Sequence, residues 1–368
     1  MKFQIPSMVM MGWLSMTVGC QPDISGSRAT TASGAEALSA GAGTWTPTST
    51  KALPYPTNSA VRLRATGEVL DSYQGFVQRY NPYTDTWRVM NPVCPPGFCR
   101  IHSMVQLSSG QVLATAGHNN KWGDYWTLMT YDPATDLWTN LPFHGELPYA
   151  GFTLTALGSG RILRAGGFNL TLGEQIPQGS TEELDPVTQT WSPVPVPMNT
   201  PRTGHLATVL YSGKVLVVGG EGNGPATAEI YDPAKKTWTL TRPPPYVQSP
   251  RQAIRLNSGQ VMVLVGGASP TETELHLYDP YNARWLAGPP LPFAAPSSTT
   301  LLHSGEVLVF NDAGQAALYD PAQNAWLPAA SATPAPPYTP TFAVLLHTGQ
   351  VLRLGGEMNA PIAERFTR

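Results

Sequence analysis

A short turn motif recurs along the chain at a nearly fixed spacing, and this spacing limits the possible folds more than any other feature. Each copy joins a Ser or Thr, a glycine, one polar residue and an apolar pair, as in Ser212-Gly213-Lys214-Val215-Leu216. The turn glycine recurs about every 47 residues, at Gly67, Gly110, Gly160, Gly213, Gly259, Gly305 and Gly349. Repeats of this length are typical of propellers and other repeat arrays.

A tryptophan series keeps the same spacing, at Trp45, Trp87, Trp138, Trp191, Trp238, Trp285 and Trp326. Most of these follow a turn such as Asp232-Pro233, where Asp binds the turn backbone and Pro presets φ. One unit then predicts four strands: HLATVL, KVLVVGG, AEIY and the strand that contains Trp238. We expect the indole ring to fill the wedge between neighbouring sheets.

The unit from Arg202 to Trp238 resembles the kelch repeat, because RTGH, GKVLVVGG, AEIYDP and TW stand in the expected order. The resemblance covers about residues 45–368 and implies an all-β fold, a seven-bladed kelch-type propeller of four-stranded antiparallel blades. The last unit ends at AERFTR without a tryptophan strand, whereas the segment around Trp45 has one and nothing before it. We expect the N- and C-terminal strands to complete one blade together, which removes free sheet edges.

The glycine pair Gly219-Gly220 does not indicate a phosphate-binding loop. Such a loop opens a helix, and here another strand follows. The pair is instead expected where a side chain would crowd a neighbouring blade. The formal net charge is −2 and no basic stripe or tail is present, which argues against nucleic acid as a partner.

The N-terminus has the pattern of an export signal, with Lys2 ahead of a short apolar stretch. Thr17-Val18-Gly19-Cys20 resembles a bacterial lipobox, which implies lipidation at Cys20; Thr17 departs from the usual Leu, so plain signal cleavage stays open. We expect a lipoprotein signal peptide over 1–19, a flexible tether over 20–43 and the propeller over 44–368. Gln21 resembles an outer-membrane sorting pattern, so we expect an envelope location, facing the periplasm or the cell surface.

The other two cysteines stand in CPPGFC, as Cys94 and Cys99. In an exported chain a small-loop disulfide is the favoured interpretation. A metal site is the weaker alternative, since two thiols need two more ligands and none is near in sequence. We expect no metal and no cofactor.

The segment from Phe98 to Gly117 resembles the matching blade of the copper-radical oxidases, the galactose oxidase and glyoxal oxidase group, with Cys99 at their cysteine position. In those enzymes the cysteine is linked to a tyrosine, but Gly151 stands at that place and Tyr149 lies two residues away. Thr339-Pro340 replaces their Tyr-His pair, and their last domain is missing. Common ancestry is compatible with this pattern, whereas copper-oxidase activity is not.

One repeat position is expected near the start of the innermost strand of each blade, close to the channel mouth. It is occupied by Ser59, His102, Phe152, His205, Arg251, Ser297 and Thr341. With only two histidines on non-adjacent blades, a structural or channel-lining role is favoured over catalysis, and the same holds for Arg202. We assign no catalytic residue.

Two long segments that follow second strands, 117–126 and 166–181, are predicted as loops, and loops on a rigid scaffold carry function. Aromatic rings mixed with Asn, Asp and Lys suit a sugar or a protein hot spot; the alternative is that these side chains only cover their own loop. Phe143, His144 and Tyr149, from the next blade junction, are expected on the same face. The candidate ligand-binding residues are His118, Asn119, Lys121, Trp122, Tyr125 and Trp126, joined by His102, His205 and Arg251.

Three functions therefore remain open. The first is a monomeric, membrane-anchored binding module for a glycan or an envelope protein. The second is a carbohydrate-active or oxidoreductase enzyme, which predicts that His102, Arg202, His205 and Arg251 converge at the channel mouth. The third is a purely structural envelope component.

Overall fold

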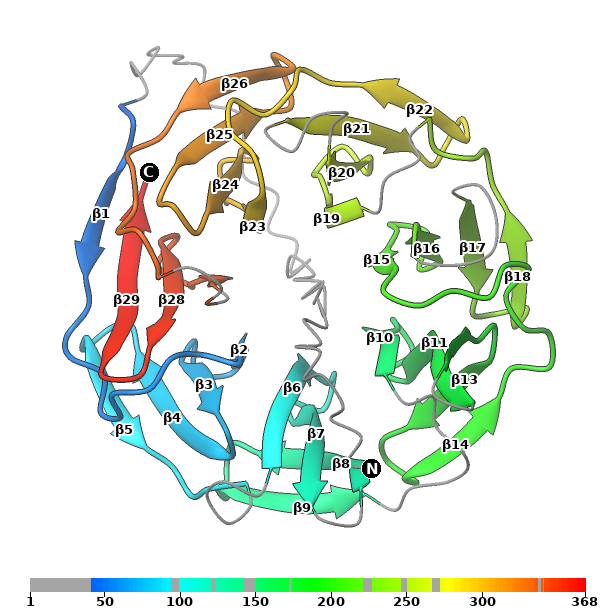
Figure 1. Cartoon of the computed structure of the whole chain (residues 1–368), viewed down its shortest axis with the longest axis horizontal. Coiled ribbons are helices and arrows are strands. Elements are labelled where there is room, and N and C mark those ends of the chain that lie inside the picture. Colours follow the sequence, from blue (N-terminus) through cyan, green and yellow to red (C-terminus); the bar gives the residue numbers. More distant parts are fainter. Residues whose placement is uncertain are drawn as a thin grey trace, which may run out of the picture.

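The computed structural model describes residues 41–93, 99–120, 123–141, 150–171, 174–220, 227–245, 250–266, 272–336, 339 and 341–368. All regular elements in these ranges are strands, and they form seven antiparallel sheets arranged as blades around one axis (Figure 1). No helix in the described part of the chain is long and apolar enough to span a membrane. The predicted seven-bladed propeller is confirmed.

The blades are numbered in chain order, and each runs from an innermost to an outermost strand. Blade 1 contains β2 (Ser59–Arg62), β3 (Val69–Tyr73), β4 (Phe76–Asn81) and β5 (Thr86–Val89). Blade 2 contains β6 (Cys99–Gln106), β7 (Val112–Asn120), β8 (Gly123–Asp132) and β9 (Leu137–Leu141). Blade 3 contains β10 (Ala150–Ala156), β11 (Ile162–Thr171), β13 (Thr181–Asp185) and β14 (Thr190–Pro193), with β12 (Glu174–Pro177) as a fifth strand paired to β11.

The remaining blades follow the same order. Blade 4 contains β15 (Leu206–Val209), β16 (Val215–Val218), β17 (Ala228–Asp232) and β18 (Thr237–Leu240). Blade 5 contains β19 (Pro250–Arg255), β20 (Val261–Gly266), β21 (Thr273–Asp279) and β22 (Arg284–Ala287). Blade 6 contains β23 (Pro296–Leu301), β24 (Val307–Asn311), β25 (Ala316–Asp320) and β26 (Ala325–Pro328). Blade 7 contains β27 (Phe342–Leu345), β28 (Val351–Glu357), β29 (Ala360–Thr367) and β1 (Thr44–Pro47).

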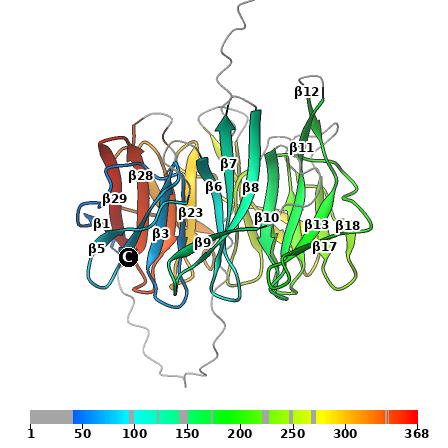
Figure 2. The same ribbon diagram turned by 90° about the horizontal axis from the view of Figure 1, so that it is seen from below.

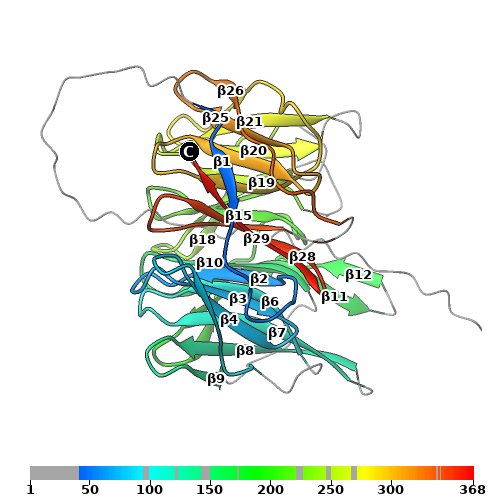
Figure 3. The same cartoon turned by 90° about the vertical axis from the view of Figure 1, so that its left-hand side faces the viewer.

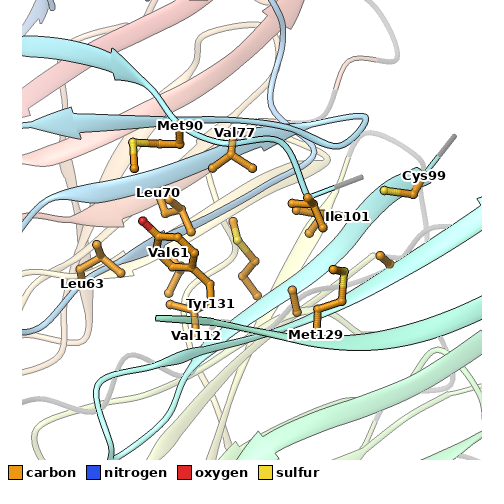
Figure 4. Packing of buried hydrophobic residues seen from close by; sticks show 14 residues of the cluster. Val61, Leu63, Leu70, Val77, Met90, Cys99, Ile101, Val112, Met129 and Tyr131 are labelled. Carbon is orange, nitrogen blue, oxygen red and sulfur yellow. The ribbon is translucent and has the colours of Figure 1, made fainter. Parts of the chain in front are cut away.

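The second strand of each blade is buried on both faces, because a neighbouring blade covers each side. In blade 4 this strand is β16, and all four of its residues are buried. A strand covered on both faces reads as a continuous apolar run, which explains the repeated Val-Leu sequences. Between blades 1 and 2 the space is filled by Leu70, Met90, Ile101 and Tyr131, among others (Figure 4).

A tyrosine and a tryptophan from the last two strands form the wedge between adjacent blades. In blade 4, Tyr231 lies opposite Trp238, with ring centroids 5.0 Å apart. The Trp238 indole N–H donates to Thr181 Oγ1 of blade 3 at 3.1 Å, and the Tyr231 hydroxyl donates to Glu183 of blade 3 at 2.7 Å. The predicted place of the tryptophan between sheets is therefore confirmed, and in blade 4 both rings also join two blades by a hydrogen bond.

Strand β1 closes the ring by pairing with β29, so that blade 7 is built from both ends of the chain (Figure 1). Trp45 lies opposite Phe366, and its indole N–H donates to the Ala330 carbonyl of blade 6 at 2.8 Å. The innermost strands of neighbouring blades are in contact all the way around the axis. The predicted closure by terminal strands is confirmed.

The two faces of the ring differ. We call the face with the seven turn glycines the turn face, and the face where second and third strands connect the hairpin face. On the turn face, the side chain two places before the turn glycine reaches toward the turn glycine of the next blade in five of the seven junctions. Cβ positions built on these glycines meet that side chain in five pairs: Gly67 with His347, Gly160 with Ser108, Gly259 with Tyr211, Gly305 with Asn257 and Gly349 with His303.

We expect Gly219→Ala to destabilise the ring more than Gly213→Ala. Both glycines have positive φ, +67° and +79°, so both alanines incur a backbone cost of about 1–3 kcal/mol. A Cβ at Gly219 would lie 2.2 Å from Pro250 Cδ of blade 5, whereas nothing lies within 4 Å at Gly213. Overpacking adds about 1–3 kcal/mol. Urea unfolding gives the free energy of unfolding of both variants. Equal decreases in the two variants would contradict the clash, because they would show that blade 5 moves away from position 219 at little cost.

Candidate functional site

Two β-hairpins extend beyond the other blades on the hairpin face, from neighbouring blades 2 and 3 (Figures 2 and 3). In blade 2, β7 and β8 stay paired out to Asn120 opposite Gly123. His118 lies opposite Tyr125, and Asn119 lies opposite Asp124. Trp126 lies opposite Gly117, whereas Lys121 and Trp122 fall outside the described residues. The predicted ligand-binding segment is thus mostly strand.

The second hairpin is formed by β11 and β12, with Phe168 opposite Pro177 and Thr171 opposite Glu174. The prediction of two long loops over 117–126 and 166–181 was therefore wrong. Asn and Gly indicate loops in both segments, but ladder pairing gives partners to the backbone N–H and C=O groups that face the opposite strand of each hairpin.

The repeat position expected near the start of each innermost strand lies directly before that strand or within its first half in every blade. Ser59 begins β2, and His205 directly precedes β15. In three blades the residue sits where the strand register shifts, at His102, Arg251 and Ser297. A bulge of this kind redirects side chains and is common at the rims of barrels and next to sites.

His205 lies inside the ring wall, with 1% of its surface exposed. Its Nε2 is 2.9 Å from Thr153 Oγ1 of blade 3, and burial, with a smaller effect of Arg202, lowers its pKa to about 3. The His205 imidazole is therefore neutral at pH 7. This position favours the structural role over the ligand-binding role.

Arg202 is also buried, with 1% exposure, and its guanidinium is fully engaged within blade 4. It donates to Glu229 Oε1 at 2.8 Å and to the Gly219 carbonyl at 2.8 Å, and Nη2 also donates to Thr227 Oγ1 at 2.7 Å. Breaking such a pair leaves an uncompensated buried charge, which costs several kcal/mol. Arg202 thus fixes the segment before β15 to the end of β16.

The four residues expected to converge at the channel mouth differ in burial. Arg202 and His205 are buried, His102 is half-buried in blade 2, and Arg251 is exposed in blade 5. Burial, and to a lesser degree Arg100, lowers the pKa of His102 to about 4, so it is neutral at pH 7. Within the described ranges, no group of three or more His, Cys, Asp or Glu could hold a metal ion.

A chain of polar contacts crosses the hairpin-face end of blades 5, 6 and 7. Gln252 Nε2 donates to the Ser297 carbonyl at 3.0 Å, and Ser297 Oγ lies 2.9 Å from Thr341 Oγ1. Thr341 in turn donates to Asp312 at 2.8 Å, because an ionised carboxylate only accepts. Sequence reasoning had placed Ser297 and Thr341 in one series but missed Gln252 and Asp312, which lie outside it.

Cys99 is disulfide-bonded at the start of β6, in register with His118. Its sulfur is therefore not linked to a tyrosine as in the copper-radical oxidases. Cys94 lies outside the described residues, so the Cys94–Cys99 pairing stays a prediction. Outside them as well lie Cys20, Phe143, His144 and Tyr149.

We expect His205 to make stability depend on pH. Its folded pKa of about 3 lies below the ordinary 6.5, so the unfolded chain binds the extra proton first as pH falls. The contribution of His205 to the free energy of unfolding is present above pH 6.5 and is lost as the pH falls toward 3. From pH 7 to 5 the wild type should lose about 2 kcal/mol more than His205→Gln, by urea unfolding at both values. Equal losses in the two proteins would contradict this assignment.

Comparisons with known proteins agree with the geometry. No family model matches the chain. It is 28% identical to the Kelch-like protein terF of Aspergillus terreus over 151 residues, which cover 39% of this chain and only 32% of that relative. Among solved structures, virginiamycin B lyase from Staphylococcus aureus aligns with a TM-score of 0.58 and 10% identity, over 88% of this chain and 99% of that one, which shows the fold alone. The repeats, the seven four-stranded blades and the similarity to a kelch-like protein together support a kelch-type β-propeller.

Proposed function

We propose that this propeller is an exported, membrane-anchored binding scaffold whose hairpin face takes a glycan. The observation that carries the proposal is the pair of hairpins projecting from blades 2 and 3 on one face (Figure 2). The first hairpin contains Tyr125 and Trp126, and Trp126 is not a member of the tryptophan series that joins the blades. Blade packing therefore does not account for it.

The architecture supports a binding role in general. A kelch-type propeller is a rigid scaffold, and function on such scaffolds resides in the segments that vary between repeats. An aromatic ring presents a negative face that attracts the polarised C–H groups of a sugar, while Asn and Asp bond its hydroxyls. The same residues suit a protein hot spot, which makes an envelope protein the alternative partner.

The enzyme alternative has less support. It needed ionisable groups converging at the channel mouth, and two of the four expected residues are buried in blade 4. The resemblance in fold to a lyase at 10% identity does not bring that activity to this chain.

A binding screen tests the glycan proposal. The full chain, purified in detergent, is applied to a glycan array beside Trp126→Ala and Trp122→Ala. Loss of one stacked ring should weaken binding at least about fivefold, since truncation of a binding hot spot costs more than about 1 kcal/mol. Tyr281→Ala is the control, because Tyr281 is 71% exposed in the turn between β21 and β22, on the turn face. Full affinity in both tryptophan variants would remove the site from the first hairpin, and no binding by the wild type would favour a protein partner.

Lipidation is tested separately at Cys20. We expect the wild type to fractionate with membranes and to incorporate labelled fatty acid, since a covalent acyl chain supplies about 0.8 kcal/mol per buried CH₂. Cys20→Ser should lose the label and move to the soluble fraction. A wild type that carries no label, with a mature N-terminus beyond Cys20, would instead establish plain signal cleavage.

A further inference from the structure

Blade 1 presents a compact cluster of three aromatic rings on the hairpin face. Tyr55 lies in the segment before β2, Tyr73 ends β3 and Phe76 begins β4. The Tyr55 and Tyr73 rings stack with centroids 5.5 Å apart, and the Tyr55 and Phe76 centroids are 4.9 Å apart. All three side chains are partly exposed. We call these residues the aromatic platform.

The propeller repeat does not explain the platform. By strand register, Tyr73 occupies the place of Gly219 in blade 4 and Gly166 in blade 3. At those glycines a Cβ would approach Pro250 Cδ or the Arg202 carbonyl of the next blade within 2.5 Å or less. Blade 1 thus carries a large ring where two other blades leave no room for any side chain.

The platform is held rigidly from below. Lys51 Nζ forms a 2.7 Å ion pair with Asp71, both side chains being 1% exposed, and donates to the Tyr55 carbonyl at 2.9 Å. The Leu53 N–H donates to Gln78 Oε1 at 3.1 Å. These contacts fix the segment that carries Tyr55, so little ordering entropy is lost when a ligand binds.

A tight connection fixes the other two rings. Tyr73 lies directly opposite Phe76, and the two residues between them, Gln74 and Gly75, have φ of +45° and +78°. Positive φ at both central residues is the mark of a type I′ turn, whose twist matches that of the strands. In addition, the blade 7 hairpin contacts the segment that carries Tyr55, because the Asn359 N–H donates to the Pro54 carbonyl at 2.9 Å.

The two platform phenols differ from the tyrosines of the blade wedges. Each wedge tyrosine has a polar partner for its hydroxyl: Tyr80 with Asp85, Tyr131 with Asp136, Tyr231 with Glu183, Tyr278 with Thr241 and Tyr319 with Asn324. Among the described residues, the hydroxyls of Tyr55 and Tyr73 have no such partner. Two phenol groups beside a stacked ring face can therefore exchange hydrogen bonds with a ligand.

The charge around the platform favours a neutral ligand. Lys51 and Asp71, which hold the Tyr55 segment and the β3 strand, neutralise each other and are buried. No ion pair or cation–π contact involves the three platform rings among the described residues. An anionic polymer would thus find no cation in the platform itself, whereas a pyranose ring offers C–H groups for the rings and hydroxyls for the phenols.

We propose that Tyr55, Tyr73 and Phe76 form a stacking subsite for a pyranose unit of a neutral oligosaccharide. This inference rests on the proposed glycan-binding function, and it adds a second contact region to the hairpin of the neighbouring blade 2. A chain of sugar units lying across blades 1 and 2 would touch both regions.

The test titrates the full chain with three soluble hexasaccharides by calorimetry: α-1,4-linked glucose, β-1,4-linked glucose and β-1,4-linked N-acetylglucosamine. We expect one of them to bind, and Tyr73→Ala or Phe76→Ala to weaken it at least about fivefold. Tyr73→Phe keeps the ring and should stay within about threefold of the wild type. Tyr281→Ala is the matched exposed aromatic on the turn face and should bind unchanged.

The outcomes separate the two proposals. Wild-type binding that survives both Tyr73→Ala and Phe76→Ala, in variants with unchanged melting temperature, overturns the platform and leaves the scaffold function standing. If an alanine variant has a lower melting temperature, the Tyr73→Phe variant decides. A loss of affinity in Tyr73→Phe equal to that in Tyr73→Ala would also contradict stacking, because Tyr73→Phe keeps the ring. If the wild type binds none of the three sugars, the platform is rejected as a neutral pyranose site, whereas binding to other glycans on the array would still support the proposed function.

Discussion

The burial of one blade against the next is the interaction on which the whole molecule depends. A single four-stranded sheet leaves both faces of its second strand open, and only two neighbours can cover them. The ring therefore has to close, and it closes through Trp45 and Phe366, which bring the two ends of the chain into one blade. Tyr–Trp wedges repeat the same solution in five other blades, with pairs such as Tyr80–Trp87 and Tyr319–Trp326, and in blade 3 Leu184 takes the place of the tyrosine.

Function and stability are divided between the two faces of this ring. The turn face is uniform, because every blade makes the same glycine turn and most blades touch the next one there. The hairpin face varies from blade to blade: a two-residue turn with the aromatic platform in blade 1, extended hairpins in blades 2 and 3, and a hydroxyl–carboxylate chain across blades 5 to 7. Variation confined to one face is what a binding scaffold needs, since its ligand surface can change without disturbing the wedges.

Much of the fold could be predicted from the sequence because it repeats. Glycine turns, Asp-Pro turns and wedge tryptophans each fix a local conformation seven times or nearly so, and Trp45 beside an incomplete last unit indicated the closure. The site was harder to predict, because it is made of exceptions. Only the strand registers show that Tyr73 stands where blades 3 and 4 have a glycine. The polar partners Gln252 and Asp312 lie far apart in sequence. The segment 117–126 has turn-forming residues, yet its backbone gains more from pairing than from solvent.

The pairing of β1 with β29 also sets the direction in which the N-terminal segment leaves the ring. Thr44 lies opposite Thr367, at the end of β29 that reaches the turn face, and the Gly41 carbonyl accepts from Arg368 there. If Cys20 carries a lipid, as we propose, the chain that leads from the anchor joins the ring on its turn face, opposite the variable hairpins.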